Sequence, residues 1–288
     1  MIENGEVSGI TWNPNNDKFY LINDENGIIW ETDSSLNIIR VITGANFGDT
    51  EDIIYFYDSK YGILTEEGKL YIGNIIEGNN NYQINTNDFQ EVEFTNHNGN
   101  NGPEGIAYDR LTGTIYIAKE KNPMEIYRFQ LPINNNDLTI EPEIPFNAQS
   151  IFFNSIDDIS AILFDDRIQR LLVLSEDSNK IIDVDPENGI IKGSYDLEED
   201  HQYEGISFLD KNYNLVIVGE PNFYLKIWRH CQSEIIAPPF NLICLVDNIL
   251  MNDENCFLDL NYDETVNIFD LLIVIDLQNG FNYYNCSQ

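Results

Sequence analysis

Acidic side chains recur at two fixed places in a repeated stretch of this 288-residue chain. In each of five copies, one acid begins an alternating apolar run, and a second acid closes the next apolar run 15 to 18 residues later. Carboxylates held close together repel one another, and protons or a hard cation such as Ca²⁺ relieve the repulsion. The first acids are Glu6, Glu51, Glu104, Asp158 and Glu204, and the second acids are Asp24, Glu66, Glu120, Glu176 and Glu220.

The elements that carry these acids are predicted to be short β-strands. In the first copy, residues 9–12, 19–24 and 28–31 are rich in apolar residues, and asparagine, proline and glycine between them favour tight turns. Successive first acids lie 45, 53, 54 and 46 residues apart, which suits a unit of about four strands. Such a sheet buries both faces only when neighbours stack on it. We therefore predict an all-β fold, a β-propeller over residues 1–229.

We count five blades, and six blades are the alternative. A fourth strand is visible in some copies, at residues 37–41 and 189–193, whereas the fifth copy shows three strands. The strand that closes a propeller usually comes from the opposite end of the chain, and residues 1–5 are too few to supply it. We therefore expect that N-terminal sequence is missing.

The first strand of each blade lines the central channel of a propeller, so the five first acids are expected to form a ring at one mouth. Such a ring can hold calcium, which takes six to eight oxygen ligands. The alternative use is structural, with each carboxylate accepting hydrogen bonds from backbone amides of the neighbouring blade. For the second acids, which end the second strands, the structural use is favoured.

The same acids also allow hydrolysis, because carboxylates around a metal ion can activate water. The chain has three histidines, His97, His201 and His230, and contains no Gly-x-Ser-x-Gly motif and no phosphate loop. No nucleophile with a base beside it is evident. We therefore favour a binding protein with an unknown propeller ligand. The alternative is a metal-dependent hydrolase, acting on a lactone, a phosphoester or a glycan in the channel.

The charge of the chain limits its partners. It carries 15 Lys and Arg against 49 Asp and Glu, a formal net charge of −34. This charge makes nucleic acid and anionic membrane surfaces poor partners and cations good ones. No stretch approaches the roughly 18 unbroken apolar residues of a membrane span, so we expect no transmembrane segment.

The cysteines favour a location outside the cytoplasm. Cys231, Cys244, Cys256 and Cys286 all lie in the last 58 residues, and their spacings match no zinc site. Two disulfides in a small C-terminal module fit better, and disulfides persist in oxidising compartments. The first residues lack the features of a signal peptide. We expect an extracellular, periplasmic or cell-surface protein whose signal peptide is not in this chain, with a cytoplasmic location as the alternative.

A twelve-residue loop in the C-terminal region has the pattern of an EF-hand. Oxygen-bearing side chains stand at positions 1, 3, 5, 9 and 12, an apolar residue stands at position 8, and position 7 adds its carbonyl. Residues 271–277 then form an apolar run that ends near Gly280, which predicts a short helix. The predicted calcium ligands are Asp259, Asn261, Asp263, Thr265, Asn267 and Asp270.

Residues 230–288 resemble a dockerin, a small α-helical module of paired calcium repeats. The resemblance rests on Asp-x-Asn-x-Asp-x-x-Val-Asn-Ile-x-Asp-Leu at residues 259–271, and on a match between residues 240–247 and 269–276. Glu264 stands where the family has a glycine, and the loop before the first helix lacks ligands, so we expect one working calcium loop. The resemblance implies a cohesin-like or surface partner, and core packing is the alternative role of its contact positions. Those positions are Ile268, Phe269, Pro239 and Phe240.

Four phrases of the repeats resemble the SdiA-regulated family of β-propellers. They run Glu-x-Ser-Gly-Ile-Thr-Trp-Asn-Pro from Glu6, Pro-Glu-Gly-Ile-Ala-Tyr-Asp from Pro103, Asp-Ile-Ser-Ala-Ile from Asp158 and Tyr-Glu-Gly-Ile from Tyr203. The resemblance covers about residues 5–229. It implies an extracytoplasmic propeller that holds calcium, in a family without an agreed activity. The sequence departs from the pattern at residues 50–52, where an expected glycine is missing.

Overall fold

The computed structural model of the chain describes residues 6–227, apart from residues 25–26, 79, 96–100, 133–135, 137, 199–200 and 221–222. The C-terminal module predicted over residues 230–288 lies outside the described residues. Its calcium loop, its four cysteines and its partner-binding positions therefore stay predictions.

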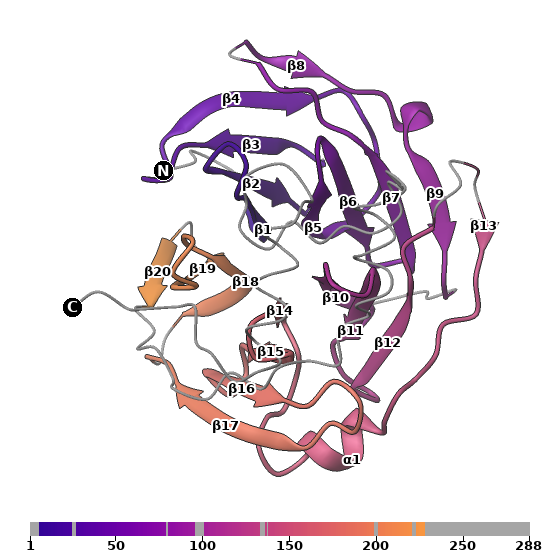
Figure 1. Ribbon diagram of the computed structural model, residues 1–288, viewed down its shortest axis with the longest axis vertical. Helices are drawn as coiled ribbons and strands as arrows, with labels where there is room; N and C mark the ends of the chain where they lie inside the picture. Colours follow the sequence, from indigo (N-terminus) through magenta and orange to yellow (C-terminus); the bar gives the residue numbers. More distant parts are fainter. Residues whose placement is uncertain are drawn as a thin grey trace, which may run out of the picture.

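Five sheets stand around a central axis and form a five-bladed β-propeller (Figure 1). The structure thus confirms five blades rather than six within the described chain. Blade 1 comprises β1 (Val7–Asn13), β2 (Lys18–Asn23), β3 (Ile29–Thr32), β4 (Ile38–Thr43) and β8 (Tyr82–Gln83). Blade 2 comprises β5 (Thr50–Tyr57), β6 (Lys60–Thr65), β7 (Lys69–Asn74), β9 (Gln90–Glu93) and β13 (Leu138–Thr139), with the 3-10 helix η1 (Thr86–Asp88) before β9.

The other three blades are narrower. Blade 3 comprises β10 (Pro103–Asp109), β11 (Thr114–Lys119) and β12 (Glu125–Gln130). Blade 4 follows the helix α1 (Ala148–Phe152) and comprises β14 (Ala161–Asp165), β15 (Arg170–Ser175), β16 (Lys180–Val184) and β17 (Ile191–Asp196). Blade 5 comprises β18 (Gln202–Phe208), β19 (Leu215–Glu220) and β20 (Phe223–Ile227).

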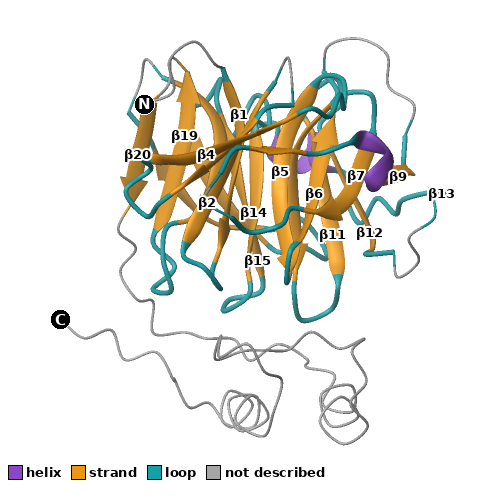
Figure 2. Ribbon diagram, turned by 90° about the horizontal axis from the view of Figure 1, so that it is seen from above, coloured by secondary structure: helices purple, strands orange, loops and turns teal. Residues whose placement is uncertain are grey.

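Contacts between the innermost strands close the ring, since β1 packs against both β5 and β18. Two short strands also join neighbouring blades at their outer edges. The strand β8 leaves the blade 2 connection to pair in parallel with β4, and β13 pairs in parallel with β9. In a side view the strands run between two rims of loops (Figure 2). The first strands all begin at the same rim, so the first acids are brought to one end of the channel.

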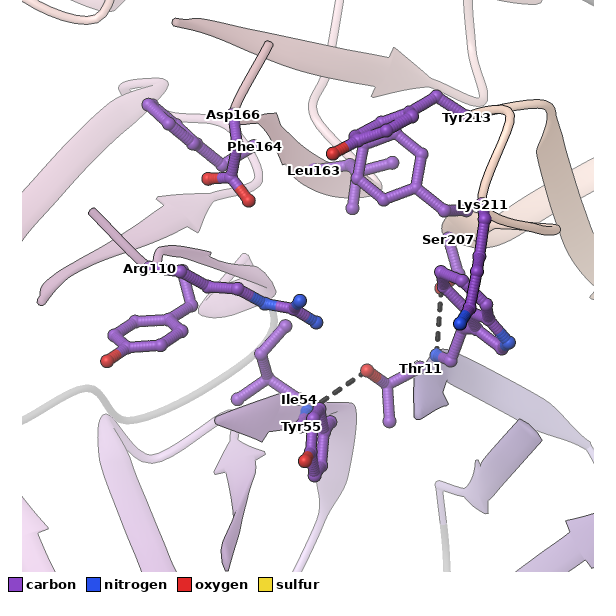
Figure 3. A pocket seen from close by; sticks show the side chains of 13 residues that line it. Thr11, Ile54, Tyr55, Arg110, Leu163, Phe164, Asp166, Ser207, Lys211 and Tyr213 are labelled. Atoms are coloured by element: carbon purple, nitrogen blue, oxygen red, sulfur yellow. Dashed lines mark hydrogen bonds between the residues drawn. The ribbon is translucent and has the colours of Figure 1, made fainter. Parts of the chain in front are cut away.

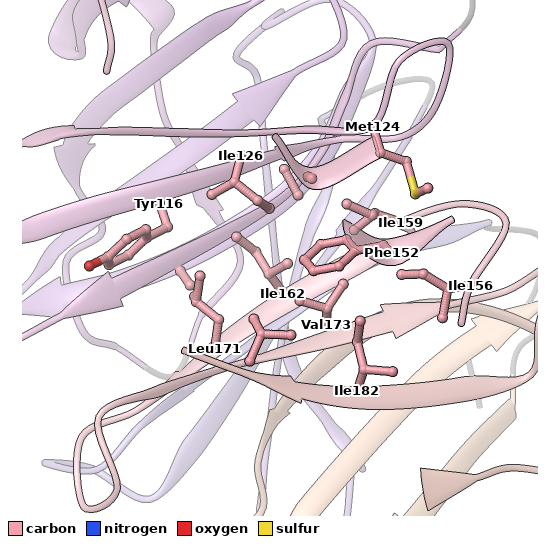
Figure 4. Close-up of a cluster of buried hydrophobic side chains, with 14 of the residues drawn as sticks. Tyr116, Met124, Ile126, Phe152, Ile156, Ile159, Ile162, Leu171, Val173 and Ile182 are labelled. Carbon is pink, nitrogen blue, oxygen red and sulfur yellow. The ribbon is translucent and has the colours of Figure 1, made fainter. Parts of the chain in front are cut away.

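Apolar side chains fill the spaces between neighbouring blades. All six residues of β11 are buried because its alternate side chains point to opposite faces of the sheet. Ile115 and Ile117 pack toward blade 2, whereas Tyr116 and Ala118 pack toward blade 4. The space between blades 3 and 4 also receives Phe152 from α1 (Figure 4). A single blade would expose both faces, which is why the ring forms as a unit.

Candidate metal centre

The innermost strands approach one another closely where the repeated Gly-Ile pair lies. A Cβ atom on Gly105 would lie 2.7 Å from the amide nitrogen of Ile162, and one on Gly205 would lie 3.1 Å from the Cα atom of Gly9. Both distances are shorter than ordinary Cβ contacts, so these positions require glycine. We call this level of the channel the throat, and its residues are Gly9, Asp52, Gly105 and Gly205.

Asp52 stands in blade 2 at the position where the other blades carry glycine or alanine. Its side chain accepts hydrogen bonds from the backbone N–H groups of Ile53, at 2.8 Å, and Ile106, at 3.0 Å, and a third from Ile10. These isoleucines are equivalent residues of blades 1, 2 and 3. Burial raises the pKa of the Asp52 carboxyl well above its usual range, and the three amides oppose that rise. Asp52 is only 5% exposed, and a Cβ atom on Gly9 would lie 2.3 Å from its Oδ1 atom. Its side chain therefore occupies the throat between the two mouths of the channel.

The mouth at which the first strands begin holds a cavity of about 320 Å³. We call it the acidic mouth because eight carboxyl groups line it, and no lysine, arginine or histidine does so within the described chain. Ser160 also lines it, is 6% exposed, and has a buried hydroxyl without a hydrogen-bond partner among the described residues. The acids are Asp49, Glu51, Glu66, Glu104, Glu120, Asp158, Glu176 and Glu204, and the uncharged polar residues are Asn101, Ser160 and Gln202.

The carboxyl groups of the acidic mouth hold protons more tightly than ordinary acids. Burial and the charge of Asp49 raise the pKa of Glu51 to about 8. Burial and the charge of Glu51, to which it is hydrogen-bonded, raise the pKa of Glu104 to about 11. Burial and neighbouring acids raise the pKa of Glu204 to about 7. A cation would compete with these protons because it stabilises the ionised carboxylates.

Two groups of acids are close enough to share an ion, since their carboxylate oxygens lie within 4.8 Å of one another. Donor sets made only of oxygen suit hard cations, and Ca²⁺ accepts carboxylates, carbonyls and water at about 2.3–2.6 Å. The residues present therefore fit calcium. The blade 2 group is Asp49, Glu51 and Glu66, and the blade 4 group is Asp158, Glu176 and Asp177.

The blade 4 group is already engaged by the protein. Asp158 is 3% exposed and accepts hydrogen bonds from the Ser175 hydroxyl and from the Asp177 amide, at 3.2 Å. The Lys121 ammonium lies 3.5 Å from the Asp177 carboxylate. By contrast, Asp49 and Glu51 form no ion pair with a basic side chain in the described part of the structure. The blade 2 group is therefore the better calcium candidate.

The structure brings together four of the five predicted ring acids. Glu51, Glu104, Asp158 and Glu204 line the acidic mouth, whereas Glu6 is exposed and does not line it. Three second acids, for which the sequence favoured a structural use, also line the cavity. They are Glu66, Glu120 and Glu176; Asp24 and Glu220 do not.

Sequence reasoning missed several residues of the acidic mouth. Asp49, Ser160 and Gln202 each stand two positions from a ring acid, a spacing that returns a strand to the same side. This two-residue spacing could have identified them as neighbours of the ring acids in the cavity. The amide-binding role that the sequence offered to the ring acids is performed by Asp52. His201 stacks on Phe223, with ring centroids 4.5 Å apart, and is not part of the cavity lining.

These features define a class of protein, a five-bladed β-propeller whose closed channel has an acidic pocket at one mouth. Residues 1–228 match the SdiA-regulated family, and the chain belongs to that family. Within the residues described, no helix is long and apolar enough to cross a membrane.

Comparison with solved structures finds distant matches. A chain of a nidogen/laminin complex is 13% identical with a TM-score of 0.51, and the match covers 74% of this chain and 72% of that chain. A calcium-binding protein, regucalcin from Agrobacterium tumefaciens, is 12% identical with a TM-score of 0.47, and the match covers 75% of this chain and 83% of that chain. At 13% identity, the first similarity concerns the fold alone.

Proposed function

We propose that this propeller is a calcium-binding protein that acts by binding a ligand rather than by catalysis. The acidic mouth carries the proposal, because eight carboxyl groups and the buried Ser160 hydroxyl surround a cavity of about 320 Å³. Repulsion between carboxylates at such short range is relieved by protons or by a cation, and no basic side chain lines the cavity within the described chain. Calcium in the blade 2 group would offset two of the three negative charges of Asp49, Glu51 and Glu66 and fix the mouth as a rigid binding surface.

The closed channel favours binding over catalysis. Asp52 and the throat glycines end the acidic mouth below its carboxylates, so the cavity does not continue through the propeller. Among the described lining residues, no histidine, cysteine or lysine accompanies the acids as a nucleophile or as its base. The pocket thus offers an ion and a polar surface for a ligand.

Calcium titration calorimetry on the full chain tests this proposal. The predicted loop at residues 259–270 would also bind calcium, so the titration is made in a chain that carries Asp259→Ala and Asp263→Ala. Adding Glu51→Gln and Glu66→Gln should weaken calcium binding at least about tenfold, since a charged ligand pair is lost. The control Glu93→Gln removes one charge from the outer strand of the same blade and should leave the affinity unchanged.

An unchanged affinity after Glu51→Gln and Glu66→Gln would refute calcium binding at the blade 2 group. Equal weakening by Glu93→Gln would also refute it, because the effect would then follow the net charge of the chain rather than a site. Magnesium should bind the blade 2 group more weakly than calcium, because it requires near-octahedral geometry and retains its water.

The location and the partner are part of the same proposal. The chain would act outside the cytoplasm, with residues 230–288 docking to a cohesin-like or surface partner, while the propeller binds its own ligand. The support is the loop pattern from Asp259 to Asp270 and the four cysteines beside it. Calcium should raise the helical circular dichroism signal of the full chain, and Asp259→Ala with Asp263→Ala should abolish the rise. An equal rise in that variant would count against the module.

A metal-dependent hydrolase is the second candidate, and the pKa of about 7 at Glu204 favours it. A carboxylate with a pKa near neutrality can take a proton from a metal-bound water. Calcium-dependent turnover of lactones or phosphoesters that is lost in Glu204→Gln would support this candidate. Equal turnover by the two proteins would exclude catalysis by Glu204.

A further inference from the structure

The end of the channel opposite to the acidic mouth carries a second pocket. The ends of all five innermost strands and the turns after them line it, around a hollow of about 40 Å³ (Figure 3). We call it the opposite mouth. Its lining includes the polar residues Thr11, Arg110, Asp166, Ser207 and Lys211 and the tyrosines Tyr55, Tyr108 and Tyr213. The throat separates these residues from the acidic mouth, so the two pockets are distinct.

The charge of the opposite mouth differs from that of the acidic mouth. Arg110 and Lys211 reach toward the hollow from opposite sides, and Asp166 is the one acid among its described lining residues (Figure 3). The acidic mouth has eight carboxyl groups and no basic side chain in the described structure. In a chain with a net charge of −34, two cations around one small hollow favour an anionic ligand there and not at the other mouth.

Two buried hydroxyl groups add hydrogen-bond donors to the cations. Thr11 accepts a hydrogen bond from the Tyr55 amide, and Ser207 accepts one from the Trp12 amide, each at 3.0 Å. Because each oxygen already accepts an amide, its own hydroxyl hydrogen remains to be donated. Neither hydrogen has an acceptor in the described structure, although each residue is only 4% exposed. Both donors are therefore buried and available at the floor of the pocket.

Contacts among Asp166, Arg110 and Tyr55 hold the polar groups on one side of the pocket in place. The Asp166 side chain accepts the Arg110 backbone amide, and its buried Oδ1 atom has no partner among the described residues. Burial raises the pKa of Asp166 to about 8, so near neutral pH the carboxyl is mostly protonated and can donate as well. The Arg110 guanidinium lies 5.8 Å from the ring centroid of Tyr55. This aromatic contact helps to keep the guanidinium at the hollow.

We propose that the opposite mouth binds the carboxylate group of a small organic acid. A carboxylate supplies two acceptor oxygens, which match the converging Arg110, Lys211 and hydroxyl donors. At about 10–15 Å³ for each water molecule, the hollow holds about three heavy atoms, the size of a carboxylate rather than a phosphate. The apolar remainder of the acid would extend beyond the hollow, beside the partly exposed Phe208. The ring centroids of Tyr213 and Phe208 lie 4.8 Å apart, so these two rings already pack against each other in the absence of a ligand.

Fluorine NMR of para-fluorobenzoate with the full chain tests the proposal, and para-fluorobenzamide is the uncharged comparison. The benzoate should bind and the amide should not. Lys211→Gln should weaken binding about tenfold, because a charge-assisted hydrogen bond is lost. Lys192→Gln is the matched control, since both lysines are exposed and neither has an ion pair among the described residues. Arg110→Gln should weaken binding as well, and its melting temperature checks that it folds.

Two results would overturn the proposal. One is equal binding of the benzoate and the benzamide, which would show that the ring alone is recognised. The other is equal weakening by Lys192→Gln and Lys211→Gln, which would show general charge attraction. Glu51→Gln with Glu66→Gln should leave carboxylate binding unchanged. A failure of calcium binding at the acidic mouth and a failure of carboxylate binding at the opposite mouth are therefore distinguishable.

Discussion

Replacing Asp52 with alanine should destabilise the propeller by about 3 kcal/mol. The substitution removes the acceptor of three buried backbone N–H groups, those of Ile10, Ile53 and Ile106. An orphaned buried donor costs about 1–3 kcal/mol, and the release of a buried carboxylate offsets part of the total. Since a domain of this kind has about 5–15 kcal/mol of stability, the loss is a large share of the whole.

Urea unfolding followed by tryptophan fluorescence measures the effect of Asp52→Ala. The urea concentration at the unfolding midpoint should fall. The dependence of the unfolding free energy on urea concentration should stay constant, because the same surface becomes exposed on unfolding. Asp52→Asn should cost less than alanine, since the amide retains one acceptor oxygen but places an NH₂ group among N–H donors. The exposed Asp157→Ala is the matched control and should change the stability by less than about 0.5 kcal/mol. A loss below about 1 kcal/mol for Asp52→Ala would refute the role of Asp52 as the shared acceptor of the throat.

Two further predictions follow from the throat and the acidic mouth. Without calcium, stability should fall as pH rises from about 4.5 to about 8, because folding raises the pKa of Glu51 to about 8 and that of Glu204 to about 7 and so binds protons. Thermal melts over this range test it, saturating calcium should remove most of the fall, and a rise in stability without calcium would contradict it. Gly105→Ala should cost about 1–3 kcal/mol by overpacking, since its Cβ would lie 2.7 Å from the Ile162 amide nitrogen. Gly193→Ala, whose Cβ would meet its nearest atom at 3.9 Å, should be nearly neutral in the same unfolding assay.

The repeat made the propeller predictable, because the spacing of the acids reports the length of a blade whatever the loops do. The strand expected at residues 37–41 is present as Ile38–Thr43, and the one expected at 189–193 is shifted to Ile191–Asp196. The short strands β8 and β13 carry no pattern of their own. Their two residues each pair because the outer edge of a neighbouring blade lies beside them. Such pairing is a tertiary effect that local sequence does not report.

The sequence predicted a cluster of acids at one mouth of the channel, but it did not predict which acids line the cavity. Acids at equivalent positions had to converge, yet Glu6 and Asp158 both stand three residues before equivalent throat positions, Gly9 and Ala161, and only Asp158 lines the cavity. The roles of the first and second acids also merge there, because Glu66 lies close enough to Glu51 to share an ion. The sequence did flag residues 50–52 as irregular. That irregularity is Asp52, whose role depends on amides from three blades.

The opposite mouth was missed because its donors look like ordinary strand residues. Thr11 and Ser207 fill the same alternating position as Ile54 and Ala107, and hydroxyl residues are common in strands. Their meaning appears only when each is seen to hold the amide of the next blade. Arg110 and Lys211 lie in turns, where basic residues usually face solvent.

The closed throat accounts for the contrast between the two mouths. In an open channel, Arg110 and Lys211 would share one space with the carboxylates of the acidic mouth, and the opposite charges would attract one another. Asp52 prevents this by filling the channel and by using its acceptor oxygens on the amides of Ile10, Ile53 and Ile106. One buried side chain thus stands between an acidic pocket at one end of the propeller and a pocket with two basic side chains at the other.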